Sequence, residues 1–299
     1  CDRLGHGARS KAVLLPVYTI AAHPAGGSIP TPWPEFAPLR FRSAAATPYL
    51  LLLATNIPAG GSALSTCDAL AYQGANTLKR RLMSHITLIR HGQANSTARD
   101  ETSYDRLSPL GHQQAAWLGD YLRNNGQHHM RLYTGTLTRH IETAEAMATG
   151  LEPQRDARLN ELEYFTLANA MYEEHGLAIP TDQAGFSMHL PQVFDAWQTG
   201  RIKAAPEPFS AFEDRVQGAL EDIAAGDGPA LVVTSGGLIS MAMRLTMGLG
   251  IPAMANMALA IFNTSQHRLY PIGGTWSPAM FNAIPHLDHP DRHHAQTHI

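Results

Sequence analysis

The chain has 299 residues, with 22 Lys and Arg side chains against 25 Asp and Glu, 44% hydrophobic residues and two cysteines. This length is sufficient for one large domain or two small ones, and two cysteines exclude a disulfide scaffold. A formal charge of −3 gives no electrostatic footprint for nucleic acid, and no apolar run reaches the ~18 residues that span a bilayer. The composition predicts a soluble globular protein with neither nucleic acid nor a membrane as partner.

Residues 1–82 differ in composition from the rest of the chain. They carry 8 basic and 3 acidic side chains, in stretches rich in Pro, Gly, Ala and Ser with little helical or alternating period. Such composition rarely builds a core, so we expect 1–82 to be a disordered or non-native leader and the patterned chain to start at Met83. Both cysteines lie in this leader, so 83–299 uses no thiol chemistry, and we expect a reducing compartment, the cytoplasm.

An export signal is the alternative interpretation of the leader. Arg40 and Arg42 precede the apolar run 49–54, and small residues continue to Cys67, which a lipid would modify in that case. The run is short and lies far from the first residue, and Thr66 is a poor neighbour for a lipidated cysteine. We therefore favour the plain leader.

Short strands and helices alternate after Met83. The β-branched runs 86–89 and 230–233 each end in small or polar residues, which is typical of buried strands that run into loops. Ser108 and Pro109 predict the start of a helix that ends near 124–126, and Thr136 or Thr138 is expected to cap the next one. We expect Leu137, Ile141, Ala144 and Ala148 to form the buried stripe of that helix.

The second strand is followed by a predicted helix over 238–249 and a predicted strand over 259–264. This alternation predicts an α/β fold, a three-layer sandwich in which a mostly parallel sheet is covered by helices on both faces. Residues 168–210 carry scattered aromatics with weaker periodicity, and we expect them to be a helical cap insertion. Ligands bind at the carboxyl ends of such strands, where the first polar cluster, 90–92, and the second, 234–237, both fall.

Six segments of the chain, in order, resemble the histidine phosphatase superfamily, which is phosphoglycerate-mutase-like. They are Leu88-Ile-Arg-His-Gly-Gln93, Leu107-Ser-Pro-Leu-Gly-His-Gln-Gln-Ala115, Tyr133-Thr-Gly-Thr-Leu-Thr-Arg-His-Ile-Glu-Thr-Ala144, Leu159-Asn-Glu161, Val232-Val-Thr-Ser-Gly-Gly237 and Asn263-Thr-Ser265. Arg-His-Gly alone is weak evidence, but the ordered set covers most of 83–287 and is specific.

The resemblance implies phosphoryl transfer through a phosphohistidine, with His91 as nucleophile and Arg90 and Arg139 binding the phosphoryl group. The chemistry of the residues agrees, because a neutral imidazole is a good nucleophile near pH 7 and guanidinium groups match phosphate oxygens. Gly92 is expected to let the backbone approach the phosphate closely. The family pattern puts the general acid at Glu161, and Glu163, two residues on, is the rival.

Ser235 is the main departure from the family pattern, since many members have a second histidine before Gly-Gly. A serine hydroxyl and the amide of Gly236 still donate to a phosphate, so we expect activity to be weakened or retuned rather than lost. Asn95 is a further candidate phosphate ligand, with a loop-capping role as its alternative.

The expected function is hydrolysis of a phosphomonoester, with no cofactor and no metal, on a small phosphorylated metabolite or a phosphoprotein. A phosphoglycerate-mutase-like phosphotransferase and a catalytically reduced phosphate-binding module are the alternatives. The tail histidines from His286 to His298 include pairs four apart, but Pro290 between them favours a solvated tail over a zinc site. The sequence makes no prediction of oligomeric state.

Overall fold

The computed structural model describes residues 84–95, 98, 100–126, 129–272 and 275–298. The leader 1–82 and the expected start at Met83 lie outside these residues. The chain divides into two units, Cys1–Gly61 and Ser62–Ile299, and all described residues belong to the second.

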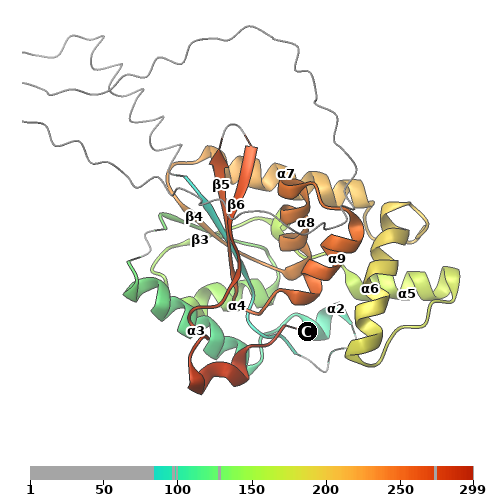
Figure 1. The fold of residues 1–299 in the computed structure, drawn as a ribbon, viewed down its shortest axis with the longest axis horizontal. Helices are drawn as coiled ribbons and strands as arrows, with labels where there is room; N and C mark the ends of the chain where they lie inside the picture. The colour runs from blue at the N-terminus through green and yellow to red at the C-terminus, as the bar shows by residue number, and fades with distance from the viewer. Residues whose placement is uncertain (1–83, 96–97, 99, 127–128, 273–274, 299) are drawn as a thin grey trace, which may run out of the picture. The chain divides into compact units, whose positions relative to one another are not determined.

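A six-stranded sheet forms the centre of the described part of the chain (Figure 1). Its spatial order is β3-β2-β4-β1-β5-β6. The strands are β1 (Ile86–Arg90), β2 (Arg131–Thr134), β3 (Pro153–Arg155), β4 (Ala230–Thr234), β5 (Gln266–Ile272) and β6 (Thr275–Ala283). The pairs β1/β4, β2/β4 and β2/β3 are parallel, whereas β1/β5 and β5/β6 are antiparallel. The predicted α/β fold is confirmed, with a mixed sheet that is parallel over four of its strands.

Helices cover both faces of the sheet, because the central strands carry apolar side chains on both sides. On one face Ile89 and Val233 pack against α3 (Pro109–Asn124) and α4 (Thr138–Met147). On the other face Ile86 and Val232 join a larger core built with α7 (Phe209–Ala225), α8 (Gly236–Met247) and α9 (Ile251–Ala260). The alternation of Ile86, Leu88 and Ile89 between the two cores follows from the two-residue period of a strand.

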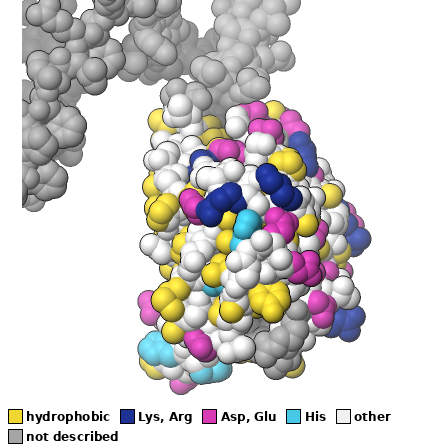
Figure 2. Space-filling view, turned by 90° about the vertical axis from the view of Figure 1, so that its right-hand side faces the viewer, with side chains coloured by type: hydrophobic (Ala, Val, Ile, Leu, Met, Phe, Trp, Pro, Cys, Tyr) yellow, Lys and Arg dark blue, Asp and Glu magenta, His cyan; other side chains and the backbone are white. Residues whose placement is uncertain are grey.

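Three further α-helices and two 3-10 helices, η1 (Ala157–Leu159) and η2 (Pro290–Ala295), complete the described part of the chain. The short α2 (Glu101–Tyr104) precedes α3, and α5 (Tyr164–His175) and α6 (Gln183–Gln198) lie beyond the sheet, next to α9 in Figure 1. The segment 168–210 is therefore helical for most of its length, and its role as a cap stays a prediction. Figure 2 shows Lys/Arg and Asp/Glu side chains next to one another on this side of the molecule, without a patch of one sign.

One predicted helix start is right, one predicted helix end is displaced, and one predicted strand is wrong. Ser108 caps α3, since its hydroxyl accepts a hydrogen bond from the amide of Gly111. The helix expected over 238–249 is α8, which ends earlier, at Met247, because Gly248 caps it in the left-handed region. The strand expected over 259–264 is wrong: Leu259 and Ala260 end helix α9, and β5 starts at Gln266. Ala, Met and Leu favour the helix, and the polar start of β5 lacks the apolar pattern of a strand.

Candidate active site

The site lies where the parallel strands end. Arg90 is the last residue of β1 and His91 follows it, Ser235 follows β4 as the N-cap of α8, and Arg139 is in the first turn of α4. The carboxyl ends of β1 and β4 are adjacent because the two strands pair in parallel with Arg90 opposite Thr234. This arrangement brings four of the predicted residues to one edge of the sheet.

His91 is a buried, neutral imidazole with one free nitrogen. Its Nδ1 lies 2.7 Å from the carbonyl oxygen of Gly92, and since a carbonyl only accepts, Nδ1 carries the proton and Nε2 carries the lone pair. Burial holds the pKa of His91 well below its ordinary value of 6.5, and the positive charges of Arg139 and Arg90 lower it further. The imidazole is therefore uncharged at neutral pH, and its Nε2 keeps the lone pair that a nitrogen nucleophile needs.

Gly92 has a packing role. A Cβ at this position would lie 2.4 Å from the carbonyl oxygen of Gly111 in α3, so only glycine lets this helix approach the loop. The amide of Gly92 donates to the hydroxyl of Thr143 at 3.0 Å. The structure therefore gives the close approach of α3 as one reason for glycine here, and the expected approach of a phosphate stays a prediction.

Arg139 is held by Asp105 and Tyr104, both at the end of α2. Its Nη1 donates to the Asp105 carboxylate at 3.0 Å, and its guanidinium lies 5.0 Å from the centroid of the Tyr104 ring. The same carboxylate accepts from the backbone amides of Thr138 and Arg139 and so caps helix α4. The cap predicted at Thr136 or Thr138 is wrong, because a side chain more than thirty residues away in sequence supplies it.

Arg90 is directed differently from Arg139. Its Nη1 donates to the carbonyl oxygens of Ile261 and His298, and its stem passes the first residue of α8, Gly236. The charge of Arg90, which directly precedes His91, contributes to the lowered pKa of this imidazole. The two arginines thus reach the histidine from opposite faces of the sheet, and Arg139 is the one that also lines the open cavity.

Glu161 and Glu163 have different surroundings, although both line the cavity. Glu161 accepts from the backbone amides of Leu162 and Gly237, each at 3.0 Å, which places its carboxylate at the start of α8. Glu163 is exposed and accepts from the hydroxyl of Thr166 in the first turn of α5. Of the two carboxylates, Glu161 is the one beside the β4 loop that carries Ser235.

A cavity of about 450 Å³ opens beside Arg139. Carboxylates predominate in its lining, with Glu101, Asp105, Glu161 and Glu163 against Arg106 and Arg139. Burial raises the pKa of Glu101 to about 6, although its carboxylate accepts from the amide of Phe165 at 2.8 Å. The lining of the cavity therefore has more acidic than basic side chains.

Ser235 and Asn95 occupy separate places. Ser235 is fully buried, and its hydroxyl lies 2.6 Å from Nε2 of His140 in α4. Asn95 comes after His91 in the segment that follows β1, and its side-chain amide donates to the carbonyl of Ser103 at 3.0 Å. The structure brings Ser235 to the site with His91 and Arg139, and it directs this contact of Asn95 to Ser103 in helix α2.

The sequence did not predict three residues of this site: Glu101, Asp105 and His140. Glu101 and Asp105 lie on a short helix that carries no apolar period, so the pattern gave no signal for them. His140 follows Arg139 directly, and the stripe expected on its helix is right only for Ala144, which is buried, whereas Ala148 is exposed. The buried face of α4 also carries Arg139, His140 and Thr143. The only signal for His140 in the sequence was its position next to Arg139, a candidate phosphate ligand.

The tail histidines contribute structure. His286 is buried and bonded to the hydroxyl of Thr264, and the ring of His298 packs against Phe262, so the expected solvated tail is wrong for these two. Among the residues that the structure describes, no group of three or more His, Cys, Asp or Glu is placed to hold a metal ion. In the same described ranges, no helix is long and apolar enough to cross a bilayer.

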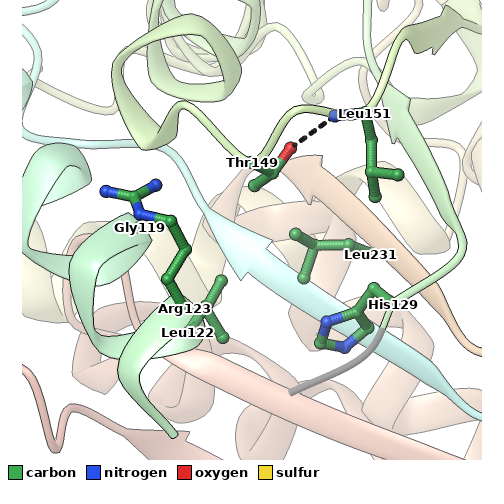
Figure 3. Close-up of a pocket in the computed structure, with 7 residues that line it drawn as sticks. All are labelled: Gly119, Leu122, Arg123, His129, Thr149, Leu151 and Leu231. Carbon is green, nitrogen blue, oxygen red and sulfur yellow. Dashed lines mark hydrogen bonds between the residues drawn. The ribbon is translucent and has the colours of Figure 1, made fainter. Parts of the chain in front are cut away.

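A second cavity lies away from these residues (Figure 3). Its volume is about 60 Å³, which holds about two water molecules. Gly119, Leu122, Arg123, His129, Thr149, Leu151 and Leu231 line it. None of the predicted site residues is among them, and a phosphate ester does not fit.

At the strand ends of this α/β fold, a neutral histidine lies together with arginines. This arrangement defines a candidate anion site. A sequence model of the histidine phosphatase superfamily, branch 1, matches residues 86–284. The chain therefore belongs to this superfamily. The match spans the whole of the site, from the strand before Arg90 to β6.

Individual relatives agree with this assignment. A protein of Salmonella paratyphi C, named probable phosphoglycerate mutase GpmB, is 29% identical over 221 residues, which are 70% of this chain and 97% of that protein. A mutant phosphoserine phosphatase from Entamoeba histolytica, solved with phosphoserine, has a TM-score of 0.52 at 18% identity, over 69% of this chain and 100% of that one. A phosphoglycerate mutase from Bacillus anthracis has a TM-score of 0.51 at 21% identity, over 69% and 96%. These two structures share the fold.

Proposed function

We propose that the protein hydrolyses phosphomonoesters through a phosphohistidine on His91. The observation that carries this proposal is the state of that imidazole: it is neutral, its Nδ1 is bonded to the Gly92 carbonyl, and two arginines lie near it. A lone pair on Nε2 beside guanidinium groups suits attack on phosphorus, because the cations stabilise charge on the transferring oxygens.

The reaction has two displacements. In the first, Nε2 of His91 forms a bond to phosphorus as the ester P–O bond breaks, and the leaving alkoxide takes a proton from the Glu161 carboxyl. In the second, water attacks phosphorus and gives its proton to Glu161 while the P–N bond breaks. The products are an alcohol and phosphate, and both His91 and Glu161 return to their starting states.

Arg139 and Arg90 bind the phosphoryl oxygens in this proposal, with Ser235 and the Gly236 amide as neutral donors and Asn95 as a further candidate. Glu161 is preferred as the acid because its carboxylate lies at the start of α8, next to Ser235. The raised pKa of Glu101 makes this residue a rival acid, since a carboxyl with a pKa of about 6 holds its proton closer to neutral pH.

The mutase alternative is favoured by the relative named probable phosphoglycerate mutase GpmB. The cavity favours hydrolysis of other esters, because its four acidic side chains outnumber its two arginines, of which Arg139 is already paired with Asp105, so it has little to bind the carboxylate of a phosphoglycerate. We therefore propose a substrate whose alcohol part is neutral or cationic, whether a small metabolite or a phosphoprotein side chain.

Turnover of p-nitrophenyl phosphate, by the full chain and by its His91→Ala variant, tests the proposal. We expect phosphate release by the full chain, with and without a chelator, and none by the variant. Equal turnover by the two proteins would overturn it. The same assay with a phosphoglycerate and an acceptor hydroxyl separates the alternatives, since a mutase transfers the phosphoryl group faster than it releases phosphate.

A further inference from the structure

His140 is a buried histidine that the proposed reaction leaves without a role. It lies on α4 directly after Arg139, with none of its side chain exposed. Its Nε2 lies 2.6 Å from the hydroxyl oxygen of Ser235, which is equally buried and follows strand β4. The pair therefore joins the first turn of α4 to the start of α8, which follows β4, a neighbour of β1 in the sheet.

The hydrogen bond between the two side chains has a direction. Burial and the charge of Arg139 hold the pKa of His140 well below its ordinary value, so the ring is neutral and carries one proton. Its Nδ1 has no hydrogen-bond partner among the described residues. A buried N–H without an acceptor is rarer than an unpaired acceptor nitrogen, so the proton belongs on Nε2, which donates to the Ser235 oxygen.

This direction leaves the hydroxyl proton of Ser235 available to a third group. An oxygen that accepts from Nε2 turns its own O–H away from the imidazole. The ring of His140 is 5.8 Å from that of His91, centroid to centroid, so the pair of His140 and Ser235 lies close to the proposed nucleophile. The phosphoryl group of the proposed reaction is the acceptor that this position would meet.

The pair also explains the serine itself. A histidine at position 235, as many members of the superfamily have, would need the space next to the Ser235 oxygen, and His140 already holds it at 2.6 Å. The site thus contains a second imidazole near His91, but it is supplied by α4 instead of by the residue before Gly236.

We infer that His140 is a positioning residue that orients the Ser235 hydroxyl to donate to the transferring phosphoryl group. This inference rests on the proposed function. Ser235 is then a phosphoryl ligand that requires His140. The two residues together, rather than Ser235 alone, take the role of the second histidine that many members of the superfamily have.

Four variants test the coupling of the pair, with p-nitrophenyl phosphate as the probe. Ser235→Ala removes the donor to phosphate, and His140→Leu removes the group that orients it, so each should lower kcat/KM by roughly 10- to 100-fold. His140→Gln keeps an N–H near the position of Nε2 and should stay within about fivefold of the natural protein. The double variant Ser235→Ala with His140→Leu should resemble Ser235→Ala alone within about threefold, because both changes remove one interaction.

A swap of the two residues is the sharpest arm of the experiment. Ser235→His alone should be poorly active, because the new ring meets His140. Ser235→His combined with His140→Ala removes the obstacle and should recover at least about tenfold of the lost kcat/KM. Thermal unfolding of each variant, followed by circular dichroism, shows whether the protein is folded.

The outcomes separate this inference from the proposed function. If the natural protein turns over and His91→Ala does not, while folded His140→Leu keeps full activity or its effect multiplies with that of Ser235→Ala, the pairing is wrong and the proposed function stands. If the natural protein shows no turnover, the proposed function fails first. Loss in His140→Leu together with rescue in His140→Gln supports the pairing.

Discussion

Asp105 accepts a hydrogen bond from Nη1 of Arg139 at 3.0 Å, and this guanidinium is almost fully buried, with 2% of its side chain exposed. The same carboxylate caps α4 through two backbone amides. One side chain therefore fixes both a helix end and a cation that lines the open cavity.

Replacement of Asp105 should destabilise the protein. Asp105→Asn leaves a buried guanidinium without its counter-charge, which typically costs about 3 kcal/mol or more of unfolding free energy. Asp195→Asn is the matched control, because the Asp195–Arg201 pair is more than half exposed on both sides and its loss should cost below about 1 kcal/mol. Urea unfolding measures both changes, and equal effects of the two substitutions would contradict the role of Asp105.

The acid that protonates the leaving group can be identified among the three cavity glutamates. Glu161→Gln should slow esters of poor leaving groups, such as alkyl phosphates, by roughly 100-fold and should slow p-nitrophenyl phosphate much less, because nitrophenolate leaves without a proton. Glu163→Gln and Glu101→Gln should lack this dependence on the leaving group. If Glu101→Gln shows this dependence on the leaving group instead, then Glu101, whose pKa is raised, is the acid.

Glu101 should make the stability depend on pH. Its pKa in the folded state is about 6, above its ordinary value of 4.5, so the folded state loses stability as pH rises through this interval. Glu101→Gln keeps the acceptor for the Phe165 amide and should stabilise the protein at pH 8 by about 1 kcal/mol, after solvent screening of a partly exposed group. At pH 4 the gain should vanish. Glu163→Gln, on the same cavity, should show no such change.

Buried histidines should make the protein sensitive to acid. Burial lowers the pKa of His267 and of His286 to about 3 and that of His129 to about 4, whereas the unfolded chain binds these protons near pH 6.5. The stability is complete above pH 6.5 and is lost as pH falls, by about 1.4 kcal/mol per histidine and pH unit. Urea unfolding at pH 7.0, 6.0 and 5.0 measures the slope. A stability that is unchanged between pH 7 and 5 would contradict the neutral, buried state of these rings.

The sequence predicted the α/β fold because its signals are local. Ser108 and Pro109 start α3 as expected, since a capping hydroxyl and a proline act on the adjacent turn. The β-branched run before Arg90 forms β1 for the same kind of reason. Such features need no information from distant parts of the chain.

The parts that the sequence did not predict depend on distant contacts. Asp105 caps α4 across more than thirty residues, so no local motif marks it. His140 has its partner in Ser235, 95 residues away, and it lies on a helix face that the apolar pattern assigned to other residues. The tail was expected to be solvated, yet Gln114 binds the carbonyl of Ala295 and holds it on the fold.

The most direct test of the account is to trap the phosphoenzyme. The protein is mixed with a labelled phosphomonoester, quenched in alkali, digested and mapped by mass spectrometry, with the nitrogen isomer determined by nuclear magnetic resonance. We predict one phosphoryl group on Nε2 of His91, because Nδ1 is bonded to the Gly92 carbonyl. Turnover without a phosphohistidine, or with the phosphoryl group on a residue other than His91, would contradict the account.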